Sequence, residues 1–185
     1  MALTQFLTVG RIAPNKKIED VIRLFYFYNK FYNGRARLLI VGRNFREFEK
    51  YQQFLQGLVK DLGLSSSVIF TGVLKQKQLN NLYRESDFYL TLSEHEGFCL
   101  PILEAFYFGL PVLALLAGGV PQTMGGAGLL VSDDRVAFLA ELLDYVLKNP
   151  VLTDKIISGQ KKVLEKFSRE RVTALMKEYL AKING

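Results

Sequence analysis

Short apolar runs that alternate with helix-like segments constrain this 185-residue chain more than any other feature of its sequence. Each run is apolar at successive positions, which is typical of strands that are buried on both faces of a parallel sheet. A glycine or a polar loop follows most of the runs. The expected strands are 6–10, 38–42, 68–72, 88–92, 111–115 and 129–131.

Between these strands, apolar residues recur every three or four positions, as in the series Ile18, Val21, Ile22 and Phe25. That spacing predicts amphipathic helices. They are expected at 18–32, 45–62, 76–85, 101–109, 133–148, 153–166 and 169–183. Strands that alternate with helices predict one Rossmann-like α/β domain over residues 1–185. It would hold a doubly wound parallel sheet of about six strands, with helices on both faces and a helical C-terminus.

The composition limits the classes of protein that fit. The chain is 49% apolar and 23% charged, which is typical of a globular domain. Its one cysteine, Cys99, excludes an internal disulfide and favours a reducing compartment, so a cytoplasmic location is expected. No apolar run is long enough to cross a membrane.

The net charge of +6 favours acidic partners such as phosphates. It also leaves open a peripheral contact with the anionic inner face of a membrane. The chain has no dense Lys/Arg tract and no zinc-finger spacing, so nucleic acid is not an expected partner. Neither a P-loop motif nor the usual dinucleotide-binding glycine fingerprint is present.

Polar and glycine-rich segments follow the expected strands at 10–16, 42–43, 72, 93–100 and 115–119. In an open parallel sheet, ligands bind outside the carboxyl ends of the strands. We therefore expect these segments to meet at one edge of the sheet and to form the binding site there.

The segment 93–104 contains the densest chemistry. A helix is expected to begin at Pro101, which leaves the amides near Phe98, Cys99 and Leu100 facing outward as an anion site. Glu96 lies in the loop, and Glu104 is expected in the first helical turn. The two carboxylates fit either a general acid/base pair or acceptors for sugar hydroxyls. The helix dipole would stabilise the ionised form of Glu104 by ~0.3–1 kcal/mol, which favours the role of hydroxyl acceptor.

Other side chains near the same edge allow two interpretations each. Arg11 and Lys16 are either phosphate ligands or solvated surface cations. Cys99 is either a reactive thiol at a helix start or a packed residue. The only histidine, His95, has no second histidine or cysteine set beside it, so no metal site is expected.

Further along the chain, Gly118 and Gly119 either bring backbone close to a ligand or form a plain turn. Asp133 and Asp134 are expected to cap the following helix. The aromatic segment 25–32 is expected to be mostly core, with Tyr26 or Phe27 facing outward, which suggests an interface with another chain or domain.

Three motifs together resemble one known family. They are Gly10-Arg11-Ile12-x-Pro14-x-Lys16, Glu96-Gly97-Phe98-x-Leu100-Pro101-x-x-Glu104-Ala105, and Gly109-x-Pro111-Val112 followed by Gly118-Gly119-Val120-Pro121. This pattern resembles the C-terminal, donor-binding half of a group 1 (family four) retaining glycosyltransferase of the GT-B fold. The resemblance covers residues 6–167.

The resemblance implies a role for each motif. Arg11 and Lys16 would hold the diphosphate of a nucleotide-sugar such as UDP- or GDP-hexose and stabilise the leaving group in place of a metal. Glu96 would contact sugar hydroxyls, and Glu104 the ribose hydroxyls. Transfer would retain the anomeric configuration through front-face attack, with no cofactor besides the donor substrate. The resemblance thus implies catalytic roles for Arg11, Lys16 and Glu96. The base would lie near Gly42, Val73 and Leu74. The residues implied to bind the donor are Gly10, Gly42, Val73, Leu74, Gly97, Phe98, Cys99, Leu100 and Glu104.

The sequence departs from the family pattern at three positions. Lys17 and Cys99 stand where glycine is frequent, and Gln122 stands where glutamate is common. These departures bear on sugar recognition more than on nucleotide binding.

A GT-B enzyme also has an N-terminal acceptor-binding domain, for which this chain has no room. The resemblance therefore implies that the chain binds a nucleotide-sugar but is inactive alone. Its partner would be an acceptor domain of the same protein or a separate subunit. The alternatives are a stand-alone nucleotide-sugar-binding or assembly subunit, and half of a nucleotide-sugar epimerase.

Overall fold

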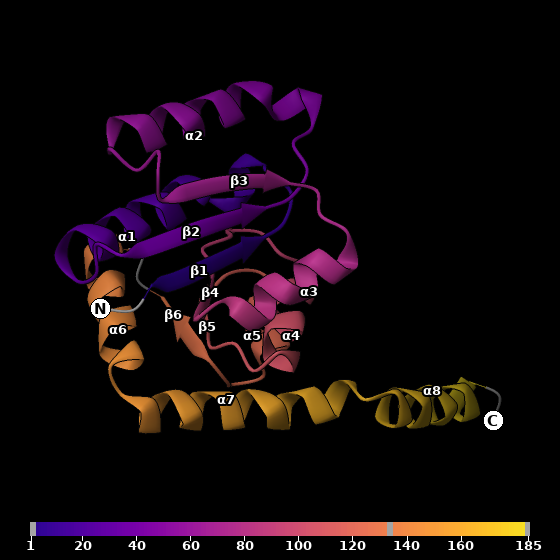
Figure 1. The fold of residues 1–185 in the computed structure, drawn as a ribbon. Helices are drawn as coiled ribbons and strands as arrows, with labels where there is room; N and C mark the ends of the chain where they lie inside the picture. Colours follow the sequence, from indigo (N-terminus) through magenta and orange to yellow (C-terminus); the bar gives the residue numbers. More distant parts are fainter. Residues whose placement is uncertain (1–2, 133–134, 184–185) are drawn as a thin grey trace.

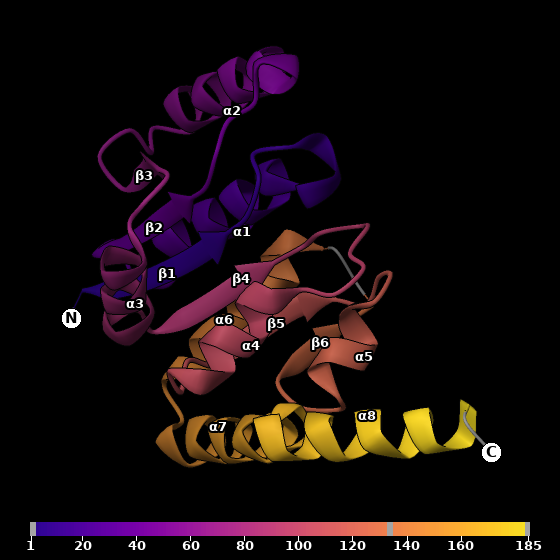
Figure 2. The ribbon, with the colours of Figure 1, turned by 90° about the vertical axis from the view of Figure 1, so that its right-hand side faces the viewer.

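A computed structural model describes residues 3–132 and 135–183, without the side chains of residues 175 and 178–183. One six-stranded sheet organises the domain, with all strands parallel and in the order β3-β2-β1-β4-β5-β6 (Figures 1 and 2). This confirms the expected doubly wound, Rossmann-like fold. The strands are β1 Thr4–Val9, β2 Ala36–Val41, β3 Val68–Gly72, β4 Phe88–Thr91, β5 Val112–Leu115 and β6 Leu129–Val131.

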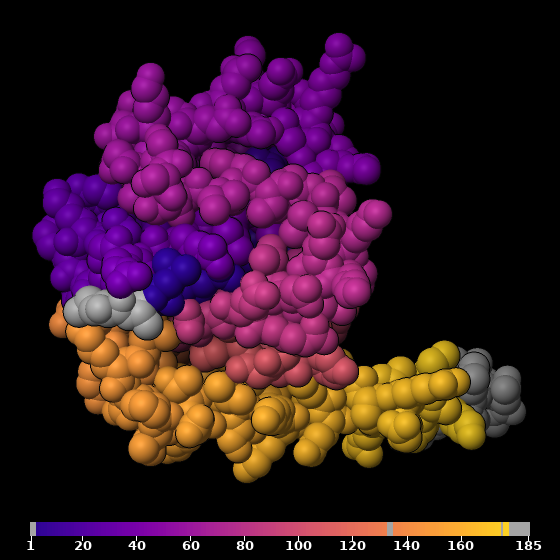
Figure 3. Space-filling model, in the orientation of Figure 1, coloured from indigo at the N-terminus to yellow at the C-terminus, as the bar shows by residue number. Residues whose placement is uncertain are grey.

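Helices follow the strands and cover both faces of the sheet (Figure 1). Three short 3-10 turns accompany them at Pro14–Lys16, Arg46–Phe48 and Glu165–Phe167. The last helix, α8, extends past the body of the domain (Figure 3). The helices are α1 Ile18–Phe31, α2 Glu49–Asp61, α3 Gln76–Glu85, α4 Leu100–Tyr107, α5 Val120–Met124, α6 Val136–Leu147, α7 Pro150–Leu164 and α8 Arg169–Ile183.

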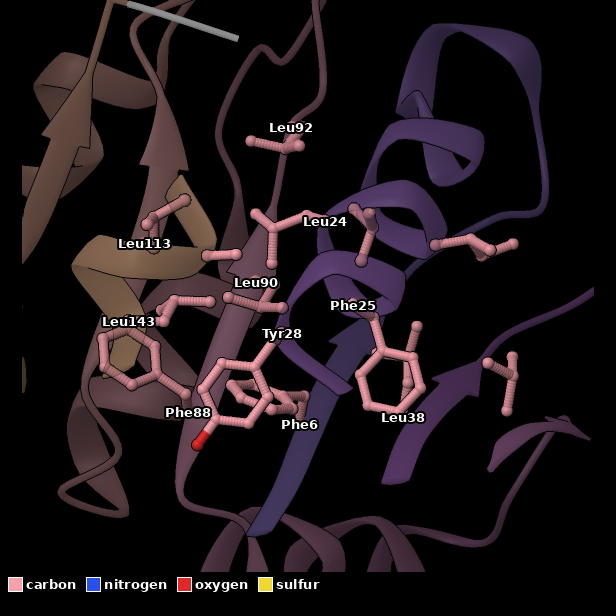
Figure 4. Packing of buried hydrophobic residues seen from close by; sticks show 14 of the residues in the cluster. Phe6, Leu24, Phe25, Tyr28, Leu38, Phe88, Leu90, Leu92, Leu113 and Leu143 are labelled. Carbon is pink, nitrogen blue, oxygen red and sulfur yellow. The ribbon is translucent and has the colours of Figure 1, made fainter. Parts of the chain in front are cut away.

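Alternate residues of each strand enter two separate cores, because successive strand side chains point to opposite faces of a sheet. Phe6 packs with α1, α2 and α6, and its ring meets that of Tyr28 edge-on at 4.7 Å between centroids (Figure 4). The next residue, Leu7, packs instead with α3, α4, α5 and the end of α7. The runs of β1, β2, β4 and β5 are thus buried on both faces, as the sequence predicts. The edge strands β3 and β6 are only partly buried, and Ile69 of β3 is 42% exposed.

The structure differs from the expected elements in a few places. Residues 120–124 form α5 inside the segment that was expected to be a glycine-rich loop. The helix expected from residue 45 begins as a 3-10 turn before α2. Helix α6 begins at Val136, and the expected cap at Asp133 and Asp134 lies outside the described residues. Tyr26 and Phe27 are both partly buried against the core, whereas Phe31 is 62% exposed.

One buried side chain joins α7 to the start of β5. Gln160 is fully buried, accepts a hydrogen bond from the Val112 amide at 3.0 Å and donates one to the Leu110 carbonyl at 2.9 Å. These two backbone groups would otherwise lie unpaired in the core, which is costly.

We predict that Gln160→Leu lowers the free energy of unfolding by about 2–4 kcal/mol, because it leaves one buried donor and one buried acceptor without a partner. Urea unfolding followed by circular dichroism measures the change. Gln56→Leu, on the exposed side of α2, is the control and should stay within ~0.5 kcal/mol. Equal stability of the two variants would contradict the prediction.

Candidate functional site

The loop after β1 and the loop after β4 are joined by hydrogen bonds at the carboxyl edge of the sheet. The carbonyl of Asn15 accepts from the Ser93 hydroxyl and from the Glu94 amide, both at 3.0 Å. The Asn15 side-chain amide donates to the His95 carbonyl at 3.3 Å. Because β1 and β4 are adjacent in the sheet, these two loops form one connected unit.

An ion pair lies inside this unit. The Lys16 ammonium is 2.5 Å from a Glu96 carboxylate oxygen, and the two side chains are only 18% and 10% exposed. They line a small pocket together with Gly10, Arg11 and residues of β1, β2 and β4. Arg11 is exposed. The structure therefore brings together all three residues that were expected to carry catalysis.

A second ion pair lies beside the first. The Lys17 ammonium is 3.1 Å from a Glu94 carboxylate oxygen, and their side chains are 32% and 50% exposed. This hydrogen bond raises the pKa of Lys17. Among the described residues, Lys17 is the only non-glycine with a positive φ, at 49°. A left-handed conformation costs an L-residue ~1–2 kcal/mol, which explains why glycine suits this position.

Glu104 is in the second turn of α4, because the helix begins at Leu100 and not at Pro101. The expectation that it lies in the first turn is wrong, and the dipole argument weakens because that effect fades beyond the first turn. The carboxylate instead accepts a hydrogen bond from the Tyr83 hydroxyl at 2.8 Å. Tyr83 is 1% exposed, and burial followed by the charge of Glu104 raises its pKa. Glu104 does not line the pocket of Lys16 and Glu96.

The helix start is partly closed to ligands. The Leu100 amide donates to the Phe98 carbonyl at 3.1 Å, so it is not the unpartnered donor that the sequence suggested. The Phe98 and Leu100 side chains are 51% and 61% exposed, and Gly97 is exposed between Glu96 and Phe98. The Phe98 ring meets Phe167 edge-on at 5.6 Å between centroids.

Cys99 is packed in the core and is 4% exposed. Burial, followed by the charge of Glu96, raises the pKa of its thiol to about 12. Of the two interpretations that the sequence allowed, the structure supports the packed residue and not the reactive thiol.

Gly118 and Gly119 allow backbone to approach backbone. The Gly119 amide donates to the Glu96 carbonyl at 2.6 Å. A Cβ on Gly119 would lie 1.8 Å from the Gly97 carbonyl oxygen, and one on Gly118 would lie 2.7 Å from that of Glu96. The two glycines therefore hold the loop that carries Glu96, a role that their sequence spacing does not reveal.

The region expected to receive the base is an open hollow beside β2 and β3, lined in part by Gly42, Asn44, Gln52 and Thr71. A Cβ on Gly42 would lie 1.6 Å from the Gly10 carbonyl oxygen, so only glycine fits there. Val73 and Leu74 are not in its lining; Val73 is 65% exposed and Leu74 packs against the core. The sequence did not point to Asn44, Gln52 or Thr71 as part of this hollow. Only Asn44 carried a signal, because it lies just after a strand.

Two kinds of feature are absent from residues 3–132 and 135–183. No three His, Cys, Asp or Glu side chains gather closely enough to hold a metal ion. No helix in this part of the chain has both the length and the apolar character needed to cross a membrane.

We predict that Cys99 in the folded protein reacts slowly with iodoacetamide at about pH 8, because burial disfavours the reactive thiolate. Guanidinium-unfolded protein should react fast, and mass spectrometry measures both rates. Raising the pH through 9 towards 12 should lower the stability, because the unfolded thiol loses its proton first. Cys99→Ser should not be labelled and should lose less stability than the wild type over this range, where buried tyrosines such as Tyr83 still titrate in both proteins. Equal labelling of folded and unfolded protein would contradict the prediction.

Comparison with known proteins places the chain in a family. Residues 3–163 match the family model of the glycosyl transferases group 1. The chain belongs to that family. The resemblance of the sequence motifs to group 1 glycosyltransferases is therefore confirmed.

This group 1 chain is 30% identical over 169 residues to the N-acetyl-alpha-D-glucosaminyl L-malate synthase of Bacillus anthracis, covering 90% of this chain and 42% of that protein. It is 35% identical over 158 residues to a D-inositol 3-phosphate glycosyltransferase of Frankia alni, covering 83% and 39%. The chain thus spans about two fifths of the length of these relatives.

Solved structures of group 1 proteins and their relatives share the fold. Anabaena HepE in complex with UDP and glucose superposes with a TM-score of 0.85 at 22% identity, over 97% of this chain and 48% of that one. The C-terminal domain of a group 1 glycosyl transferase from Francisella tularensis has a TM-score of 0.77 at 25% identity, over 88% and 85%. The chain therefore corresponds to one domain of a GT-B glycosyltransferase.

Proposed function

We propose that this chain is the donor-binding half of a retaining glycosyltransferase that transfers a hexose from a nucleoside diphosphate sugar to an acceptor. The pocket where Arg11, Lys16 and Glu96 meet carries the proposal. It places two cations and a carboxylate at the carboxyl edge of the sheet, where such folds bind ligands. The HepE structures with UDP and UDP-glucose support a nucleotide-sugar as the ligand.

The two cations suit a diphosphate. Arg11 offers a planar, permanently charged fork that can grip phosphate oxygens in pairs, and Lys16 offers a compact positive charge. Together they would stabilise the nucleoside diphosphate as it leaves the anomeric carbon, so the transfer would need no metal. The acceptor oxygen would attack from the same face as the leaving group departs, which retains the anomeric configuration.

The carboxylates suit hydroxyl groups. Glu96, on the pocket wall, would accept hydrogen bonds from the sugar. Glu104 would accept them from the ribose, with its carboxylate already oriented by the Tyr83 hydroxyl at 2.8 Å. The base would enter the hollow at Gly42, and exposed Gly97 and Phe98 would contact the sugar and phosphate.

We further propose that the acceptor site belongs to another domain, either of the same protein or of a separate subunit. The relatives that this chain matches are more than twice as long as the matched region. A cytoplasmic location, with contact to an anionic membrane surface through the net charge of +6, stays a prediction.

Calorimetric titration with UDP, GDP, ADP and their hexose derivatives tests the binding proposal. We predict that Arg11→Ala weakens binding of the preferred nucleoside diphosphate by about 1.5–3 kcal/mol, the worth of a charged hydrogen bond. Arg35→Ala, at the opposite end of the strands, is the matched control and should bind as the wild type does. If no nucleotide binds, or if both variants bind equally, the site assignment is wrong.

The same titration tests Glu104. We predict that Glu104→Gln lowers the preference for a ribonucleotide over its 2′,3′-dideoxy analogue about tenfold, because a carboxylate accepts from vicinal hydroxyls more strongly than an amide. Binding of the dideoxy nucleotide itself should change little. An unchanged preference would remove Glu104 from the ribose site.

The purified chain is expected to release or transfer no sugar from radiolabelled nucleotide-sugars, because the acceptor site lies in another domain. Thin-layer chromatography of the products checks this. Transfer to an added acceptor by this chain alone would contradict the two-domain proposal, and an epimerised nucleotide-sugar would favour the epimerase alternative.

A further inference from the structure

The ammonium group expected to bind phosphate is already occupied. Lys16 is paired with Glu96 at 2.5 Å, and both side chains are largely shielded from solvent. Solvent and salt screen such a pair far less than an exposed one. The ammonium has three N–H donors but a single positive charge, so a diphosphate entering the pocket shares Lys16 with Glu96 and competes with it for that charge.

Arg11 differs from Lys16 in this respect. It is exposed at the same pocket and has no ion-pair or hydrogen-bond partner on its side chain within the described part of the chain. Its charge is available to any phosphate. Phosphate binding through Arg11 therefore meets no competing carboxylate, whereas phosphate binding through Lys16 draws the one positive charge away from Glu96.

Glu96 cannot easily move out to water when it loses Lys16. Its carbonyl accepts from the Gly119 amide at 2.6 Å, and the glycines at 118 and 119 fit closely against its backbone. Asn15 holds the preceding residues of the same loop. A mostly buried carboxylate without a partner is strongly destabilised, so it needs a replacement donor within the pocket.

The hydroxyls of the transferred sugar are such donors. A free nucleoside diphosphate has only its ribose hydroxyls, which the proposed function assigns to Glu104, outside the lining of this pocket. We infer that Glu96 is a specificity-determining residue that favours the intact nucleotide-sugar over the free nucleoside diphosphate. The diphosphate takes Lys16 from Glu96 at a low cost only when the sugar hydroxyls replace the ammonium group. This inference rests on the proposed function, and it gives Glu96 a second role as the competitor of phosphate for Lys16.

The pair Lys17–Glu94 provides a matched control on the same two loops. It has the same residue types and a distance of 3.1 Å, but its side chains are 32% and 50% exposed. Glu94→Gln removes the same charge two residues away. Any general electrostatic gain for an anionic ligand therefore appears in both variants.

The test is calorimetry with three proteins: wild type, Glu96→Gln and Glu94→Gln. Each protein is titrated separately with the free nucleotides UDP, GDP and ADP and with the nucleotide-sugars UDP-glucose, GDP-mannose and ADP-glucose. Glu96→Gln should bind the free nucleoside diphosphate about tenfold more tightly, because the phosphate no longer competes for Lys16. It should bind the nucleotide-sugar no more tightly than the wild type. Glu94→Gln should change both by less than about threefold, as expected of an exposed pair.

The Lys16→Gln background shows whether the gain passes through Lys16. Adding Glu96→Gln to that variant should change the affinity for the nucleoside diphosphate by less than about twofold. Glu96→Asp keeps the charge but shortens the reach to Lys16, so it should give a smaller gain in the same direction. It serves as the second variant should Glu96→Gln fail to fold by circular dichroism.

The outcomes separate the two proposals. Failure of wild type and all variants to bind any of the six nucleotides would overturn the proposed function and this inference together. Binding with an unchanged or weaker affinity of Glu96→Gln for the free diphosphate would overturn the inference alone. The inference would also be overturned if Glu94→Gln, or Glu96→Gln added to Lys16→Gln, raised the affinity for the free nucleoside diphosphate as much as Glu96→Gln does in the wild type.

Discussion

The parallel pairing of β1 with β4 is the constraint on which the rest of the site depends. After β1 the chain builds outward through β2 and β3, then returns to lay β4 against the free side of β1. The helices that follow these two strands, α1 and α4, pack in the cores on opposite faces of the sheet, while the loops that lead to them meet at its carboxyl edge. Arg11 and Lys16 come from one loop and Glu96 from the other. Residues 80 positions apart in the chain therefore meet because two central strands pair.

Hydrogen bonds and close backbone contacts then hold the loops around this pocket. Asn15 bonds to three consecutive residues of the β4 loop, and the Gly118–Gly119 backbone supports that loop from the β5 side. Two further glycine contacts hold the start of the β2 loop: Gly42 lies against the backbone of Gly10 after β1, and its amide donates to the carbonyl of Gly72 at the end of β3. Groups that are held this way before a ligand arrives lose little entropy when it binds.

The sequence predicts the order and type of the helices and strands well, but it does not predict which side chains contact one another in the site. Strand β3 and helices α3 and α8 have the expected bounds, because each has an unbroken pattern between clear stops. Helix α5 escapes prediction because its five residues lie among glycines that indicate a loop. The motif positions of Arg11, Lys16 and Glu96 indicate one edge of the sheet. That Lys16 contacts Glu96, and that Glu104 contacts Tyr83, depends on tertiary packing that no local pattern records.

Three glutamates within eleven residues show how packing divides one residue type into different chemistries. Glu94 is half exposed and pairs with Lys17 where solvent screens the charges. Glu96 lies on the pocket wall and is largely shielded from solvent. Loss of its partner Lys16 would be costly there, because a shielded carboxylate without a partner is destabilised. Glu104 lies against a buried tyrosine hydroxyl that orients one carboxylate oxygen. One carboxylate could not both pair with Lys16 and serve the proposed ribose site, because Glu96 and Glu104 lie in different surroundings. The spacing of the last two glutamates matters because it carries the backbone from the loop, where Glu96 meets the β1 segment, into α4, where Glu104 meets α3.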